Sequence, residues 1–413
     1  MNVPPLPAAP VASRPQAAAA VALQALGAVA ALLSTWLVTR HFGLEAQGRF
    51  GLVKSWSDAL MTLAMLGLPQ ALLHLSFQDI TLVPGLLRFA WRLTLGCAGL
   101  ALLAVLTLAW QPAWLWLAGP VLACPAFVLH GQLRALLLRT AGAWVYAVAT
   151  VLPALGLLLA LAGLTWADRQ DWGAALLLSA IVSAAGAVLL VARAGQPWRG
   201  VRAPLPPSLW HINGHALVQN LAAALPVALI LSVLAALGAS DTAVGEVSLS
   251  LVFVQVFAAL AGFAAPLVYQ RAALAAGAQA PARLLRIVPV ALLLPALAWL
   301  LMPELLARLL PAGQAGGPGL RHGAAAMVTV GLLMLANRVA ATTLQARGEF
   351  AELSAQAVFR LLATLGLLGL LWHVGLPAVL AAAGAMLVTE TLIGARSLQR
   401  IVRHRNPPAP ESC

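Results

Sequence analysis

The feature that most constrains this chain is a series of apolar runs, most near 20 residues long, separated by short polar segments. A run of about 18 residues or more suits a membrane-crossing α-helix, whereas membrane β-strands are about half as long and alternate in polarity. With 62% hydrophobic and 9% charged residues, the chain could not cover a water-soluble surface. The sequence predicts an all-α integral membrane protein of about twelve transmembrane helices. The predicted helices are 17–39, 50–75, 87–110, 114–131, 144–164, 173–192, 210–237, 244–268, 286–302, 324–343, 353–373 and 376–396.

The placement of the cations predicts how the chain is oriented. Of its 24 lysines and arginines, sixteen fall in segments on the side of the N-terminus, five on the opposite side and three inside predicted helices. Cytoplasmic loops carry the excess of such residues, so we expect both termini in the cytoplasm of a bacterial inner-membrane protein. The net charge of +12 therefore needs no nucleic-acid partner. The three cysteines are isolated in the sequence, and neither a disulfide framework nor metal-ligand spacing is present.

Residues Arg193–Pro207 interrupt the apolar series, because they carry three arginines and four prolines. The halves on either side have matching turns: Arg40–Phe50 corresponds to Leu237–Val247, and Leu138–Trp144 corresponds to Leu344–Phe350. Six helices in each half give both halves the same orientation, which predicts a parallel repeat with a substrate path between the halves. The expected parts are a disordered N-terminus (1–16), an N-terminal six-helix bundle (17–192), a cytoplasmic linker (193–209), a C-terminal six-helix bundle (210–396) and a basic cytoplasmic tail (397–413).

Three segments resemble the polysaccharide-transporter, or Wzx-type oligosaccharide flippase, branch of the MOP (MATE-like) exporter superfamily. They are the turn Thr39–Phe50, the end of the second helix at Leu66–Leu72, and the arginine-bearing turn Leu133–Tyr146. The resemblance implies a V-shaped pair of six-helix bundles that open alternately to either side. It also implies movement of undecaprenyl-diphosphate-linked glycans from the inner to the outer leaflet of the cytoplasmic membrane.

Charged residues inside the predicted helices are the candidates for substrate contact, because each costs about 2.5–3.5 kcal/mol at a helix centre. Lys54 and Asp58 are four residues apart and therefore adjacent on one helix face. One interpretation is a self-neutralising pair that snorkels toward the surface. The other is that Lys54 meets a diphosphate or an acidic sugar, with Asp58 holding it or exchanging a proton.

A polar stripe begins the seventh predicted helix. His211, His215 and Gln219 follow at steps of four, with Asn220 adjacent, so they share one face for two turns. A lone histidine would be a packing residue, but this stripe predicts a cavity lining whose imidazoles attract phosphate.

The tenth and eleventh predicted helices contain Arg338 and Arg360, which are the remaining candidates for the substrate cavity. Arg360 is too deep to snorkel. The alternative is a hydrogen-bond network between helices, using Glu352 or Glu390, that locks the C-terminal bundle. Trp110, Trp114 and Trp116 cluster at an outer boundary and predict an interfacial belt.

We therefore predict a transporter rather than an enzyme: a flippase for polyprenyl-diphosphate-linked oligosaccharide in O-antigen, capsule or exopolysaccharide assembly. It needs no cofactor or metal, and its partners are the lipid-linked glycan, the bilayer, a glycan polymerase and glycosyltransferases. Two alternatives stay open. A cation-coupled drug antiporter of the MATE type predicts an acid-dominated cleft. A membrane glycan polymerase predicts a large outer loop with acidic or arginine catalytic residues, whereas the longest predicted outer loop, Pro303–Gly323, contains only Glu304, Arg308, Arg321 and His322.

Overall fold

A computed structural model describes residues 14–110, 112–194, 207–274, 297–308 except 298, 303 and 307, 318–346 and 349–403. All regular structure in these ranges is helical. Ten of the described helices are long and apolar enough to cross a membrane, which confirms the prediction of an all-α, multi-pass membrane protein. Several predicted parts lie wholly or partly outside the described residues: the N-terminus (1–16), the linker (193–209), the helix at 286–302, the loop Pro303–Gly323 and the tail (397–413).

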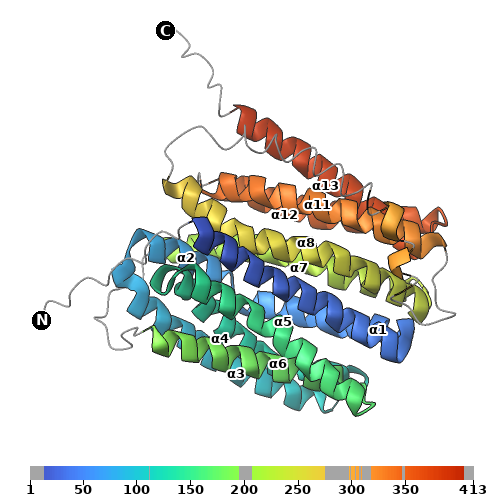
Figure 1. Cartoon of the computed structure of the whole chain (residues 1–413), viewed down its shortest axis with the longest axis horizontal. Helices are drawn as coiled ribbons and strands as arrows, with labels where there is room; N and C mark the ends of the chain where they lie inside the picture. Colours follow the sequence, from blue (N-terminus) through green and yellow to red (C-terminus); the bar gives the residue numbers. More distant parts are fainter. Residues whose placement is uncertain are drawn as a thin grey trace, which may run out of the picture. The chain divides into compact units, whose positions relative to one another are not determined.

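The described chain forms two units, of which the first is Met1–Ser232. Its helices α4, α5 and α6 pack on one another, α3 packs on α4, and α1 packs along α5 (Figure 1). Large apolar side chains of α3 remain exposed, such as Leu95 (68%) and Leu100 (69%), as expected for a surface that faces acyl chains. The elements are α1 (Arg14–Ala64), α2 (Leu68–Gln78), η1 (Ile80–Leu82), α3 (Val83–Leu108), η2 (Pro112–Leu117), α4 (Ala118–Thr140), α5 (Gly142–Trp166), α6 (Trp172–Arg193) and α7 (Ser208–Ala236), whose last residues belong to the second unit.

The first two predicted helices are joined differently from the prediction. The chain stays helical from Arg14 to Ala64 except at Gly43, whose φ of 87° and ψ of 178° are non-helical. The predicted turn at 40–49 is therefore a kink at one glycine, which tolerates positive φ because it has no Cβ.

The predicted helix at 50–75 is wrong at its end, since α1 stops at Ala64 and a new helix begins at Leu68. Leu66 and Gly67 between them have φ values of 51° and 70°, and Pro69 follows in the first turn of α2. A left-handed residue followed by proline is an ordinary helix stop, and the apolar run conceals it.

Helix packing in the first unit is supported by a buried histidine that the sequence did not single out. Pro153 in α5 has no N–H, so the carbonyl of Ala149 one turn earlier loses its helical partner. His130 of α4, which is 4% exposed, places Nε2 2.8 Å from that carbonyl oxygen. A backbone group in hydrocarbon must be satisfied within the protein, so this histidine is structural.

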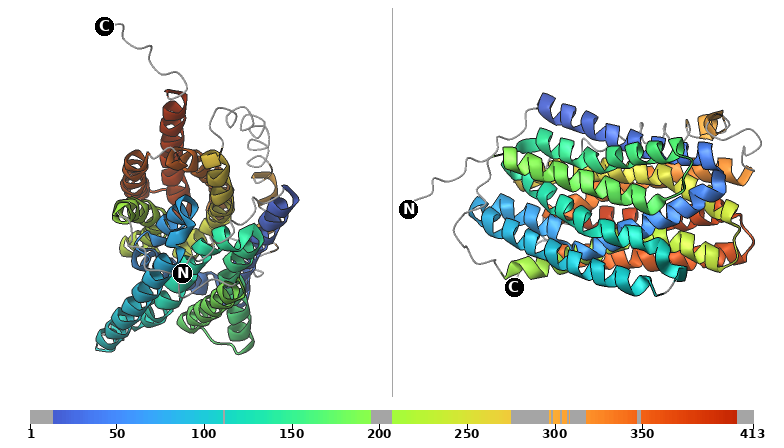
Figure 2. Two further views of the ribbon diagram at one scale, coloured as in Figure 1. Left: turned by 90° about the vertical axis from the view of Figure 1, so that its left-hand side faces the viewer. Right: turned by 90° about the horizontal axis from the view of Figure 1, so that it is seen from below.

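The second unit, Val233–Cys413, contains α8 (Asp241–Leu274), α11 (Pro318–Ala346), α12 (Phe350–His373) and α13 (Ala378–Arg403). Helix α11 packs against both α8 and α13, and α12 packs against α13. The helices of each unit run roughly along one direction (Figure 2, right), as membrane spans must. This packing brings the middles of α11, α12 and α13 together, where the charged residues lie.

Candidate substrate-binding residues

Lys54 and Asp58 form an ion pair on the second half of α1. Lys54 Nζ lies 2.6 Å from Asp58 Oδ2, and their side chains are 26% and 43% exposed. The pair spans one helical turn, which is the most favourable separation for opposite charges on a helix. The structure therefore neutralises Lys54 within its own helix.

We expect this pair to act mainly as a unit. Asp58→Ala leaves one cation in a membrane helix and should lower stability by about 1–2 kcal/mol, less than the full insertion cost because the pair is partly exposed. The double variant Lys54→Ala/Asp58→Ala should recover most of that loss. Thermal unfolding of the purified protein in detergent measures both. If the double variant were less stable than Asp58→Ala, Lys54 would have a further partner.

The predicted polar stripe of α7 is present on the described part of that helix. The imidazole rings of His211 and His215 meet edge to face, with centroids 4.7 Å apart. Asn220, two turns on, exchanges two hydrogen bonds of 2.7 and 2.6 Å with the amide of Gln70 on α2. The stripe thus joins α7 to α2 at one end and is open at the other, where His211 is exposed.

Two amides on α7 have buried atoms without hydrogen-bond partners. They are Nε2 of Gln219 and both side-chain atoms of Asn213, a residue that is only 5% exposed. Sequence reasoning missed Asn213, because it lies midway between His211 and His215, two residues from each, and so falls outside the four-residue spacing. An unsatisfied buried amide costs about 1–3 kcal/mol, so these positions are suited to a bound water or a polar ligand group.

The two polar groups of the first unit lie far apart. Trp56, between Lys54 and Asp58 in sequence, donates from Nε1 to Ser232 Oγ on α7 at 3.0 Å. Ser232 follows His211 by 21 residues, which is about 31 Å along a helix that rises 1.5 Å per residue. One small headgroup therefore cannot contact the histidines and Lys54 at the same time.

In the second unit, a carboxylate from α13 links three helices. Glu390, whose side chain is 3% exposed, accepts from Arg360 of α12 at 2.6 and 3.1 Å and from Asn337 of α11 at 2.8 Å. Asn337 also donates to the Glu390 backbone carbonyl at 2.8 Å. A bidentate arginine–carboxylate pair is a strong, geometrically specific contact. Arg360 therefore belongs to the inter-helix network that the sequence offered as an alternative.

Arg338 lies next to this network and has no carboxylate of its own among the described residues. It follows Asn337 on α11 and is partly buried, and its guanidinium is electrostatically repelled by that of Arg360. Within the described part of the chain, Glu390 pairs with Arg360 alone. Among the described residues, the guanidinium of Arg338 therefore has no carboxylate to neutralise it.

A second network joins the start of α12 to the last turns of α13. Glu352 accepts from Arg396 at 2.6 and 3.2 Å and from Arg400 at 3.2 Å, and Gln356 joins Glu352 to Ser397. Arg396 and Arg400 are 56% and 42% exposed, so this cluster lies near the surface. Sequence reasoning named Glu352 as a network residue, and the structure supplies its partners.

One acidic residue was missed. Glu246 of α8 is partly buried, and its carboxylate has no ion pair within the described part of the chain. In the sequence it lies where the predicted turn Leu237–Val247 overlaps the start of the predicted helix 244–268. Helix α8 begins earlier, at Asp241, so Glu246 lies more than one turn inside the helix.

The helical arrangement resembles known transporters. An inward-facing multidrug resistance MATE family transporter of the MOP superfamily aligns over 95% of this chain and 100% of its own length, with a TM-score of 0.71 at 15% identity. The chain has the fold of the MATE transporters. DinF-BH, a MATE multidrug transporter solved in complex with a ligand, aligns over 96% of this chain and 97% of its own, with a TM-score of 0.60 at 15% identity. A MOP superfamily transporter from Pyrococcus furiosus aligns over 94% and 96%, with a TM-score of 0.57 at 12% identity.

No family model and no curated protein sequence matches this MATE-like chain. The two multidrug transporters are 15% identical to this chain, and the likeness shows the fold that they share. The prediction of the MOP superfamily fold is confirmed, and the Wzx-type branch within it remains a prediction. The residues that would distinguish the branches are the charged ones described above.

Proposed function

We propose that this protein exports a lipid-linked glycan, moving polyprenyl-diphosphate-linked oligosaccharide from the inner to the outer leaflet of the bacterial cytoplasmic membrane. The glycan would serve O-antigen, capsule or exopolysaccharide assembly, alongside a polymerase and glycosyltransferases. Transport proceeds by alternating access, with both termini in the cytoplasm. The MATE-like fold supports transport, and Arg338, which has no carboxylate partner among the described residues, supports an anionic cargo.

The observation that carries the proposal is the excess guanidinium of Arg338. Arg338 lies eight residues before the end of α11 and Arg360 ten residues after the start of α12, so each is about 12–15 Å from the nearer helix end. A cation at such depth is costly unless it meets an anion. Glu390 satisfies Arg360, and a diphosphate would satisfy Arg338 without breaking that pair. Planar guanidinium groups bind phosphate oxygens in bidentate fashion, which makes arginine well suited to this role.

The direction of transport follows from electrostatics. Moving an anion outward across an inside-negative membrane is favourable by about 2.3 kcal/mol per charge per 100 mV. Positive charge within the spans lowers the desolvation cost of the diphosphate on its way. The exposed end of the α7 stripe, at His211 and His215, supplies polar donors for the headgroup where it enters.

A second candidate function is cation-coupled export of small molecules, as in multidrug transporters of this fold. Glu246 favours it, because a partly buried carboxylate without a counter-ion can hold a proton or a sodium ion. The P. furiosus relative is described as having a binding pocket of reversed polarity that suggests a different function. Pocket polarity is therefore the property that separates the two candidates, and Arg338 and Glu246 are the residues to compare.

The test is leaflet exchange of a labelled polyprenyl-diphosphate oligosaccharide by the purified protein in proteoliposomes. We expect Arg338→Ala to slow exchange about 10- to 100-fold, the loss of one charge-assisted hydrogen-bonding group worth about 1.5–3 kcal/mol. Arg338→Lys should retain part of the rate. Arg308→Ala, which removes an arginine whose side chain is 78% exposed, is the matched control and should be neutral.

Wild-type protein that exchanges the lipid no faster than empty liposomes would exclude the glycan cargo. In parallel, efflux of an organic cation is measured under a proton or sodium gradient. Efflux that is lost in Glu246→Gln and unaffected by Arg338→Ala would establish the second candidate instead.

A further inference from the structure

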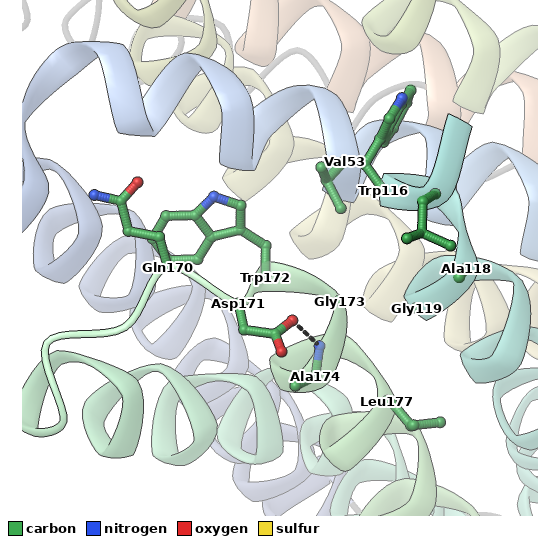
Figure 3. Close-up of a pocket in the computed structure, with 11 residues that line it drawn as sticks. Val53, Trp116, Ala118, Gly119, Gln170, Asp171, Trp172, Gly173, Ala174 and Leu177 are labelled. Carbon is green, nitrogen blue, oxygen red and sulfur yellow. Dashed lines mark hydrogen bonds between the residues drawn. The ribbon is translucent and has the colours of Figure 1, made fainter. Parts of the chain in front are cut away.

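A cavity of about 510 Å³ lies at one end of the first unit, where η2 and the start of α4 meet the start of α6. Its walls are aliphatic on two sides, at Val53 and Leu177, and aromatic at Trp116 and Trp172, and its rim carries Gln170 and Asp171 (Figure 3). A volume of this size lies in the range of small-molecule sites. None of its lining residues belongs to the candidate substrate-binding groups described above.

The cavity is built on a rigid contact. A Cβ added to Gly119 of α4 would lie 2.3 Å from Gly173 Cα, so the two helices touch through their backbones. Trp172 is 6% exposed and is held edge to face by Phe42 and Phe50, at centroid distances of 5.4 and 5.6 Å. One aromatic wall is therefore fixed. The other, Trp116, is 36% exposed and accessible from outside.

The carboxylate on the rim of the cavity is held in place as well. Asp171 Oδ1 accepts a 2.9 Å hydrogen bond from the backbone N–H of Ala174 and so caps α6. Its other carboxylate oxygen has no hydrogen bond among the described residues, and the neighbouring Gln170 amide is exposed. The rim thus offers a carboxylate acceptor and an amide that both donates and accepts.

This combination favours a neutral polyol over other ligands. An acyl chain would desolvate the carboxylate without replacing its hydrogen bonds. A phosphate would meet Asp171 and no lining cation. An organic cation would be attracted by the Asp171 carboxylate and by the indole faces, so binding of such a cation is the outcome that the test must separate from sugar binding. A sugar ring has an apolar C–H face that packs on an indole and peripheral hydroxyls that bond a carboxylate, an amide and an indole N–H.

We propose that this cavity binds one or two sugar residues of the glycan, as a site separate from the one that binds the diphosphate. The inference rests on the proposed function for the identity of the ligand. By the predicted orientation the cavity opens on the outer side of the membrane, where the glycan arrives.

The test uses the full-length protein in lipid nanodiscs and the free oligosaccharide released by mild acid from the polyprenyl-diphosphate carrier. Binding is measured by calorimetry. We expect Trp116→Ala and the cavity-filling Leu177→Trp to weaken binding at least ten-fold. Asp171→Asn replaces the carboxylate with an amide, and asparagine caps helices as well as aspartate does. This variant should therefore keep the start of α6 intact and weaken sugar binding about three-fold. Trp110→Ala removes an 88% exposed tryptophan nearby that does not line the cavity, and should leave binding unchanged.

Equal affinity in the wild type, Trp116→Ala and Leu177→Trp would overturn the proposal, as would binding of tetraphenylphosphonium in place of the sugar. Leu177→Trp alters a cavity wall and could prevent folding. Trp116→Ala alters an exposed side chain, so its melting temperature should stay near that of the wild type. If it does, the binding result for Trp116→Ala decides the question alone. Leaflet exchange of the lipid-linked glycan is measured on the same samples. Exchange without cavity-dependent sugar binding would refute this site alone. Cavity-dependent binding without exchange would refute the flippase alone.

Discussion

Glu390→Ala is expected to destabilise the second unit by about 3–5 kcal/mol, the cost of leaving a buried charge without its partner. Glu390 is 3% exposed at its side chain and accepts from both Arg360 and Asn337. Its removal strands the Arg360 guanidinium beside Arg338 and leaves the Asn337 amide without its carboxylate acceptor. Thermal unfolding of the purified protein, followed by circular dichroism in one detergent, measures the loss.

The control is Glu304→Ala, which breaks an exposed arginine–glutamate pair with Arg308 whose side chains are 67% and 78% exposed. Such surface pairs contribute about 0–1 kcal/mol, so this variant should melt close to the wild type. The double variant Arg360→Met/Glu390→Leu should recover most of the stability, because an apolar replacement of a buried pair is often neutral. An unchanged melting temperature in Glu390→Ala would show that the network does not hold the helices together.

The sequence predicts the helices well because hydrocarbon permits few alternatives. Every spanning segment must satisfy its backbone internally, so an apolar run of sufficient length is a helix whatever its neighbours are. Most of the predicted spans have a matching helix among the described residues. The connections between consecutive helices were less predictable. Two helices meet within α1 at the non-helical Gly43, whereas Leu66 and Gly67 separate α1 from α2 inside an apolar run that shows no polar interruption.

The pairing of the candidate residues could be predicted from the sequence only in part. Lys54–Asp58 follows from spacing on one helix, and its ion pair is present. The pairing of Arg360 with Glu390, rather than with Glu352, depends on how α12 and α13 cross, which no local pattern specifies. Asn213 and Glu246 were missed for a similar reason. Their significance lies in the absence of partners, and partners are a property of the packed structure.

These pairings change which charge matters for function. On sequence alone, Lys54, Arg338 and Arg360 are all candidates for the substrate cavity. In the structure Lys54 is neutralised by Asp58 and Arg360 by Glu390, so neither has a free charge to offer a ligand. Arg338 is the one of the three that has no carboxylate of its own within the described residues. A transport defect should therefore be largest for Arg338, and a defect in Arg360 variants should be accompanied by lost stability.

Gly67→Ala should be the most damaging small substitution in the first unit, costing about 3 kcal/mol or more from two sources. Gly67 has a φ of 70°, which costs a residue with a Cβ about 1–2 kcal/mol. That Cβ would also lie 2.4 Å from the Asn213 carbonyl oxygen and 2.6 Å from the Leu217 nitrogen. Both atoms are backbone of α7, so no side-chain rotation relieves the clash, and α2 must separate from the polar stripe.

Gly142→Ala separates these two contributions, because Gly142 has a φ of 87° but nothing within 4 Å of an added Cβ. This variant should be destabilised only by the cost of a positive φ for a residue with a Cβ, about 1–2 kcal/mol. The readout is alkylation of the buried Cys124 thiol on heating, in a background of Cys97→Ser and Cys413→Ser. Equal losses in both variants would mean that α2 and α7 are not in backbone contact. A larger loss in Gly67→Ala means that α2 and α7 are in backbone contact beside the Gln70–Asn220 pair, so the close approach at Gly67 and this amide pair together hold α2 against α7.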